Sequence, residues 1–152
     1  MDITKLTGLE FLQAMDRGEI PKASIAETIP MDGVLAEKGR VVFEVKADDR
    51  HLNPFGMVHG GFAATVLDAV TGCAVHTMLD PCVGFGTIDL NIKMLRPIPK
   101  EVSLTAEGRI ISISKSLGVS EGTLKDERGR LYAHATASCM ILAIRNRFAR
   151  KP

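Results

Sequence analysis

The sequence predicts an α+β fold, in which an antiparallel sheet of five or six strands wraps round one long central helix. Two observations support this prediction. Residues 61–79 form an apolar run long enough for a buried helix, and four segments in which apolar and polar residues alternate follow it. Because short turns join these four strands, the pattern excludes the alternation of strands and helices that a doubly wound sheet requires.

The remaining elements follow in chain order. Residues 7–17 have the apolar spacing of a short amphipathic helix, and Pro21 begins a connector. Residues 39–46 alternate as a strand does, and residues 47–61 form a loop rich in Asp, Asn, Pro and Gly. The strands expected after the central helix are 87–94, 101–114, 116–126 and 130–144, the last two joined by a hairpin turn at 126–129.

Length and charge set the class of protein. The 152 residues suffice for one domain, of which residues 1–30 are the N-terminal helix and connector and residues 145–152 a basic tail. The 19 basic and 18 acidic side chains leave a net charge of +1, which argues against nucleic-acid and membrane-surface partners. Three cysteines without metal-type spacing are typical of reduced thiols, so we expect a cytoplasmic protein.

Asp68 is the most informative single residue. It is the only formally charged residue between Gly61 and Leu79, inside the helix that is expected to be buried. An ionised carboxylate costs several kcal/mol to bury unless it is paired or hydrogen-bonded. We therefore expect Asp68 to have a function, while a cap on a neighbouring chain's helix or loop is the structural alternative.

A second group of residues precedes this helix. The chain carries Asn53, then the segment Gly56-Met57-Val58-His59-Gly60-Gly61, then Asp68, and Thr87-Ile88-Asp89-Leu90-Asn91 opens the next strand. With residues 8–12 and 95–97, this pattern resembles the PaaI-like acyl-CoA thioesterase family, which has the hotdog fold. The resemblance covers nearly the whole chain. It implies a homodimer or a dimer of dimers, a catalytic acid on the central helix, and coenzyme A along the subunit interface, with no separate cofactor.

Thioester hydrolysis requires a base or nucleophile for the carbonyl carbon and donors for its oxygen. Matching the family motif assigns the Gly60 N–H as the donor, at the positive end of the helix, and Gly61 lets the substrate approach the backbone closely. Asp68 either attacks the carbonyl to give a mixed anhydride or deprotonates a water molecule. The sequence leaves these two routes open.

The distance along the helix bears on assembly. Gly60 and Asp68 are eight residues apart, which is about 12 Å of helix, so both groups of one chain cannot contact one carbonyl. We therefore predict a composite site in which Asn53, His59 and Gly60 of one subunit face Asp68 and Thr87 of the other, as the family's dimer implies.

The supporting residues each have a structural alternative. Gly60 and Gly61 serve the substrate, or they serve only close helix packing. Asn53 orients water or the carbonyl, or it forms the turn before Pro54. His59 contacts the thioester region, or it holds the loop. Thr87 positions the attacking water, or it is an ordinary threonine on a half-buried strand.

Other candidates carry weaker signals. His76 and Asp80 have helical spacing, but no zinc-type ligand pair recurs, so no metal site is expected from the potential ligands His51, His59, Cys73, His76 and Asp80. Cys73 is expected to fill the core rather than to act as a nucleophile. The candidates for coenzyme A phosphate contacts, of which Lys115 is preferred, are Arg96, Arg109, Lys115 and Lys125.

Two other functions compete with hydrolysis. A hotdog enoyl-CoA hydratase would need a separate Asp and His pair for the addition of water, and His59 lies too early in the chain to pair obviously with Asp68. A non-hydrolytic acyl-CoA or acyl-carrier binding module would use the same pocket, but the N-terminal stretch is too short and too weakly basic for a DNA-binding segment.

Overall fold

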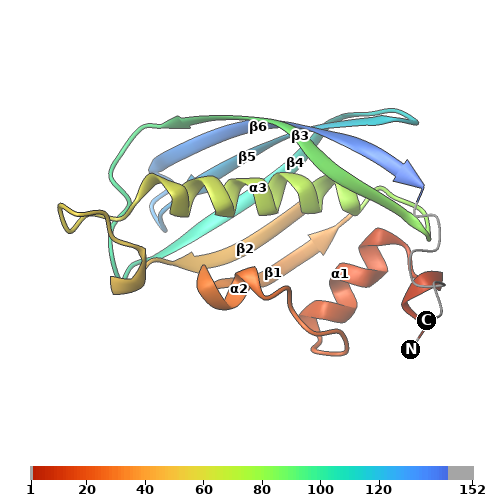
Figure 1. Cartoon of the computed structure of the whole chain (residues 1–152), viewed down its shortest axis with the longest axis horizontal. Helices are drawn as coiled ribbons and strands as arrows, with labels where there is room; N and C mark the ends of the chain where they lie inside the picture. Colours follow the sequence, from red (N-terminus) through yellow and green to blue (C-terminus); the bar gives the residue numbers. More distant parts are fainter. Residues whose placement is uncertain (1, 144–152) are drawn as a thin grey trace, which may run out of the picture.

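The computed structural model describes residues 2–143, and the predicted tail 145–152 lies outside them. A six-stranded antiparallel sheet curves round one long helix, α3 (Gly60–His76), which confirms the predicted architecture (Figure 1). The strands are β1 (Met31–Glu37), β2 (Arg40–Lys46), β3 (Val83–Met94), β4 (Ser103–Ile113), β5 (Leu117–Lys125) and β6 (Leu131–Ala143). The shorter helical segments are Ile3–Lys5, α1 (Gly8–Asp16), α2 (Ile25–Thr28) and Asp49–His51.

The order of strands in the sheet is β1-β2-β4-β5-β6-β3. The chain therefore leaves α3, forms β3 at one edge of the sheet, and returns to build β4, β5 and β6 beside β2. Strand β1, at the opposite edge, was not among the predicted strands. Its pairing with β2 shifts register between Gly33 and Leu35, so its side chains do not alternate cleanly between buried and exposed.

Helix α3 packs closely on the concave face of the sheet. Its sheet-facing side chains, which include Val66, Leu67 and Val70, are fully buried. Close packing requires Gly108 of β4, because a Cβ at that position would lie 2.0 Å from the carbonyl oxygen of Val70. No helix among residues 2–143 is long and apolar enough to cross a membrane.

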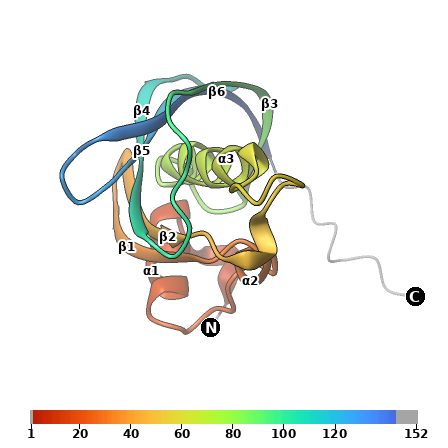
Figure 2. The same cartoon turned by 90° about the vertical axis from the view of Figure 1, so that its left-hand side faces the viewer.

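The opposite side of α3 is less covered than predicted. Thr65, Asp68, Ala69 and Cys73 are only half-buried in the single chain. Figure 2, which looks along α3, shows that the sheet leaves one side of the helix uncovered between β3 and α2. The expectation of a helix buried all round therefore fails on this side, and an apolar helix face is left without a cover from the sheet.

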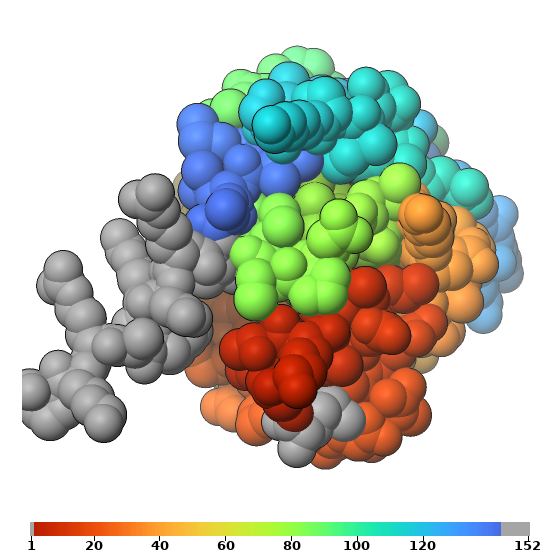
Figure 3. Space-filling model, turned by 90° about the vertical axis from the view of Figure 1, so that its right-hand side faces the viewer, coloured from red at the N-terminus to blue at the C-terminus, as the bar shows by residue number. Residues whose placement is uncertain are grey.

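Helix α1 covers the C-terminal end of α3. Its N-terminus is fixed by a capping box, in which Thr7 and Glu10 exchange side-chain and backbone hydrogen bonds. The Gly8 N–H donates to the carbonyl oxygen of Leu79 at 3.0 Å, and the ring of Phe11 lies 5.6 Å from that of His76. Figure 3 shows α1 packed beneath this end of the central helix.

Candidate active site

The N-terminus of α3 is capped by His59. The Nδ1 atom of His59 accepts the Gly61 N–H at 2.8 Å, and the His59 N–H donates to the carbonyl oxygen of His51 at 2.7 Å. A Cβ at Gly61 would lie 2.9 Å from that Nδ1, so only glycine lets the ring fold back over the helix end. His59 therefore has the predicted structural role, and the Gly61 amide is already engaged.

The Gly60 N–H is left available. The Gly61 N–H is bound by the His59 ring, and the Phe62 N–H donates to the carbonyl oxygen of His59 at 3.0 Å. The Gly60 N–H has no hydrogen-bonding partner within residues 2–143. It lies at the positive end of the α3 dipole, which favours a group that carries negative charge.

Asn53 forms the turn that its structural alternative predicts, and its side-chain NH2 stays available. Its Oδ1 accepts the N–H groups of Phe55 at 2.9 Å and Met57 at 3.2 Å, so it forms the turn. Its side-chain NH2 makes no hydrogen bond to any other described residue, and Asn53 lines the same cleft as Gly60. The amide nitrogen is thus a second donor beside the free N–H of Gly60.

His51 supports the loop that carries these donors. Its ring is buried, with Nε2 2.6 Å from the carbonyl oxygen of Thr28 and Nδ1 accepting the Asp48 N–H at 2.9 Å. The ring also packs against Phe62, with centroids 5.2 Å apart. Sequence reasoning considered His51 only as a potential metal ligand and assigned it no structural role, although the Asp-x-x-His spacing of residues 48–51 is the available signal for this cap.

Asp68 lies in the middle of α3, on the side that the sheet leaves uncovered. It is half-buried, and its Oδ1 atom is fully buried with no hydrogen-bonding partner among the described residues. A buried carboxylate oxygen without a partner is costly. This geometry fits an acid that meets its partner in a substrate or in another chain.

Thr87 lies on the same side of the molecule as Asp68. It pairs with Cys139 across β3 and β6, and its Oγ1 is 3.8 Å from the Cys139 sulfur. Burial raises the pKa of the Cys139 thiol, the hydrogen bond with Thr87 lowers it, and the charge of Asp68 raises it further. Thr87 therefore contacts a buried thiol that the charge of Asp68 also influences.

A β-bulge accompanies Thr87. The register of β3 against β6 shifts between Thr87 and Asp89, and Ile88 between them is 57% exposed. The predicted strict alternation of residues 87–94 is thus interrupted at this point. Bulges of this kind re-aim side chains and often lie beside active sites.

A cleft of about 300 Å³ lies beside the N-terminus of α3. The residues that line it and bear on function are Asn53, Gly60, Met94, Arg96 and Tyr132. Lys115 lies elsewhere, in the turn between β4 and β5, where Gly118 packs on Val75 near the C-terminal end of α3. Of the predicted basic residues, Arg96 is therefore the one that shares the cleft with Gly60.

Cys73 and His76, the candidates for a nucleophile and a metal ligand, both have structural roles. Burial raises the pKa of the Cys73 thiol to about 12, so Cys73 is protonated near neutral pH and is a poor nucleophile. The His76 ring lies between Phe11 and Phe85, each 5.6 Å away, and burial lowers the pKa of this histidine. Within residues 2–143, no group of three or more His, Cys, Asp or Glu side chains is arranged to hold a metal ion.

Comparison with known proteins identifies the family. Residues 55–133, which span all of α3 and the strands β3, β4 and β5, match the model of the Thioesterase superfamily. The chain belongs to this superfamily. The match begins within the loop that carries the donors and includes Gly60, Asp68 and Thr87.

Three relatives of this thioesterase illustrate the likeness. The structure of a phenylacetic acid degradation-related protein from Ralstonia eutropha JMP134 has 32% identity and a TM-score of 0.77, covering 84% of this chain and 97% of that one. The E. coli PaaI protein has 17% identity and a TM-score of 0.78, with coverages of 91% and 96%. Acyl-coenzyme A thioesterase 13 of Homo sapiens is 27% identical over 101 residues, which are 66% of this chain and 71% of that protein. These findings confirm the predicted PaaI-like hotdog thioesterase.

Proposed function

We propose that this thioesterase hydrolyses acyl-CoA thioesters to the free acid and coenzyme A, at a site shared by two subunits. The observation that carries the proposal is the buried, unpartnered Oδ1 of Asp68 on the uncovered side of α3. The printed name of the human relative, an acyl-coenzyme A thioesterase, supports the choice of substrate.

Two features support a shared site. Gly60 and Asp68 lie on one continuous helix, eight residues and therefore about 12 Å apart, so one carbonyl cannot contact both in a single chain. Within residues 2–143, strand β3 is an edge strand that pairs only with β6, and it exposes Ile88. An exposed edge with apolar side chains is a surface that another strand or chain can cover. In the shared site, Asn53 and Gly60 of one subunit face Asp68 and Thr87 of the other.

The reaction needs negative charge to be stabilised on the thioester oxygen. The free N–H of Gly60 and the side-chain NH2 of Asn53 donate to this oxygen as the carbonyl carbon becomes tetrahedral. His59 and His51 hold these donors in place. A donor of this kind typically contributes about 100-fold to 1,000-fold in kcat.

Asp68 supplies the second half of the chemistry. In one route its carboxylate removes a proton from water, the water oxygen bonds to the carbonyl carbon, and the carbon–sulfur bond breaks as the proton passes to the leaving thiolate. In the other route Asp68 itself bonds to the carbon, the thiolate leaves, and water then hydrolyses the mixed anhydride. Thr87 holds the attacking water in either route.

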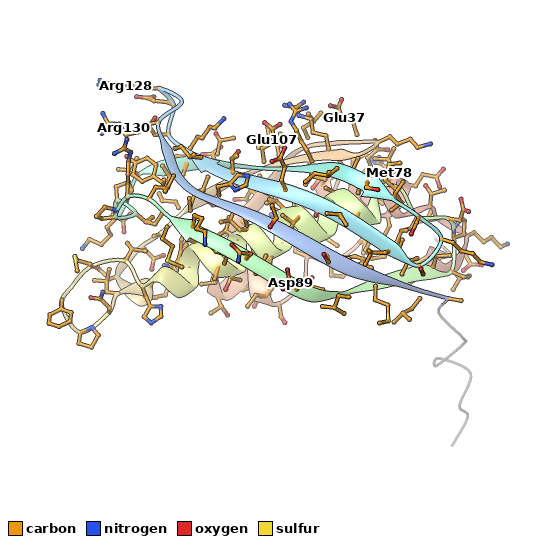
Figure 4. The ribbon with its side chains drawn as sticks, turned by 90° about the horizontal axis from the view of Figure 1, so that it is seen from above. Glu37, Met78, Asp89, Glu107, Arg128 and Arg130 are labelled. Atoms are coloured by element: carbon orange, nitrogen blue, oxygen red, sulfur yellow. The ribbon has the colours of Figure 1, made fainter. Side chains whose placement is uncertain are left out.

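The coenzyme A phosphates need basic contacts, and the pantetheine arm separates these phosphates from the thioester at the donors. Arg96 lines the cleft that contains Gly60. Figure 4 shows Arg128 and Arg130 at the β5–β6 hairpin, at the end of the sheet where β3 ends and β4 begins. Because β3 ends beside Gly60, these arginines lie at the same end of the molecule as the donors. Lys115 remains a predicted contact, although it lies beside the C-terminal end of α3, away from the donors.

The test of the proposed function is Asp68→Asn, assayed by release of the free thiol from a panel of acyl-CoA substrates. We expect hydrolysis to fall by at least about 1,000-fold, since Asp68 carries the base or nucleophile. Equilibrium binding of acyl-CoA and the melting temperature should stay close to those of the unaltered protein. The control is Asp80→Asn, an exposed aspartate just after α3. Full activity in Asp68→Asn would contradict the proposal.

A further inference from the structure

An apolar cavity of about 140 Å³ lies under the N-terminal segment of the chain. Its walls come from α1 through Met15, from α2 through Ala26, from β2 through Phe43, and from α3 through Ala69 and Cys73. It is separate from the cleft beside the N-terminus of α3, with which it shares no lining residue. None of the proposed catalytic residues lines this cavity.

The floor of this cavity is the stretch of helix that carries the proposed catalytic acid. Ala69 follows Asp68 directly in α3, and Cys73 lies about one turn beyond Ala69 on the same face. The negative charge of Asp68 also adds to the rise in the pKa of Cys73, which is mainly due to burial. Asp68 is therefore the immediate neighbour in α3 of a residue that lines the cavity.

The size of the cavity limits what it can hold. A cavity of about 150 Å³ lined by aliphatic and aromatic side chains is known to bind benzene. The present cavity is of nearly the same volume, so it accepts a single aromatic ring or an aliphatic chain of about six carbons. A chain of about ten carbons is too large for it unless its end leaves the cavity.

The charges at the cavity select against anionic groups. Burial raises the pKa of the Asp16 carboxyl, which means that its environment disfavours additional negative charge. Lys22, the basic residue of the lining, is already paired with the carboxylate of Asp32. A neutral, apolar group is thus the occupant that the lining favours.

We propose that this cavity holds the acyl group of the thioester, and that the segment formed by α1 and α2 sets the acyl preference to neutral groups no larger than one ring or about six carbons. The inference rests on the proposed function, because it assumes that the thioester is placed at Asp68. It adds a binding site for the acyl group, built by a part of the chain that does not supply the proposed catalytic residues.

The first experiment fills the cavity. Ala26→Phe places a ring where the acyl group would lie, and kcat/KM is measured with acetyl-, hexanoyl-, phenylacetyl- and decanoyl-CoA. We expect the values for hexanoyl- and phenylacetyl-CoA to fall by about tenfold or more, the loss typical of one or two displaced apolar contacts, while acetyl-CoA changes by less than about twofold. Val34→Phe is the matched control, because Val34 is 63% exposed and is not part of the cavity lining.

The second experiment enlarges the cavity. Met15→Ala shortens one of the α1 side chains that line the cavity, and the ratio of kcat/KM for decanoyl-CoA to that for hexanoyl-CoA should rise by about tenfold. This variant also keeps the inference testable if Ala26→Phe does not fold, which circular dichroism would detect.

The two proposals fail in different ways. If the unaltered protein hydrolyses no acyl-CoA, or if Asp68→Asn stays active, the proposed function is wrong. If the unaltered protein is active and Asp68→Asn is not, but the cavity variants change all four substrates equally or none of them, the acyl group lies elsewhere and the inference is wrong.

Discussion

The buried ring of His51 provides a quantitative test of how the donor loop is held. In His51→Ala the chain loses the contact to the Thr28 carbonyl at 2.6 Å, the acceptor for the Asp48 N–H at 2.9 Å, and the packing on Phe62. Two hydrogen bonds contribute about 1 kcal/mol each. Removal of the packed ring adds at least about 1 kcal/mol, so we expect the free energy of unfolding to fall by about 3 kcal/mol.

Urea denaturation measures this change. With a slope of about 2 kcal/mol per M, a loss of about 3 kcal/mol lowers the midpoint by about 1.5 M. Activity should also fall by about 100-fold, because a misplaced donor loop no longer fits the transition state. The control is His134→Ala, which removes an imidazole that pairs with Glu121 across β5 and β6, where a loss below about 1 kcal/mol is expected. A change below about 1 kcal/mol in His51→Ala would refute the reasoning.

Two further predictions concern the ends of α3. Gly61→Ala should displace the His59 ring, since the new Cβ would lie 2.9 Å from Nδ1. Loss of this helix cap should lower the free energy of unfolding, measured by urea titration, by about 1 kcal/mol. An unchanged free energy of unfolding would show that the ring does not cap the helix. Burial lowers the pKa of His76, so the unfolded chain binds the proton more tightly and stability should decrease as the pH falls below about 6.5. His76→Phe should weaken this decrease between about pH 7 and pH 5 when melting temperatures are compared. An identical dependence of the melting temperature on pH in His76→Phe and in the unaltered protein would contradict this prediction.

The sequence was sufficient to predict the elements that have strong periodicity. The apolar run predicted α3 within three residues at either end, and alternation predicted the strands from β4 to β6. Strand β1 and helix α2 were missed for physical reasons. The bulge between Gly33 and Leu35 breaks the alternation of β1, and α2 has four residues, which is too short for an amphipathic pattern.

The candidate site was predictable to a similar extent. Asp68 was identifiable because a single charge in an apolar helix is conspicuous, and the structure places an unpartnered carboxylate oxygen there. The hydrogen bonding within the donor loop was not predictable. Whether Gly60 or Gly61 has a free N–H depends on where the His59 ring lies, and the support from His51 depends on a contact with Thr28, 23 residues earlier in the chain.

The central claim is that each site takes its donors from one subunit and its acid from the other. Complementation between two inactive variants tests it most directly. Asn53→Asp keeps an oxygen for the turn to Phe55 and Met57 but loses the NH2 donor, and Asp68→Asn loses the acid. Each variant alone should release almost no thiol from hexanoyl-CoA.

Co-expression of Asn53→Asp with Asp68→Asn allows mixed dimers to form. In each mixed dimer, one site combines the intact Asn53 of one chain with the intact Asp68 of the other. Half of randomly assembled dimers are mixed and half of their sites are intact, so about a quarter of the activity of the unaltered protein should return. No recovery in verified mixed dimers would contradict the account, because it would mean that both groups act within one chain.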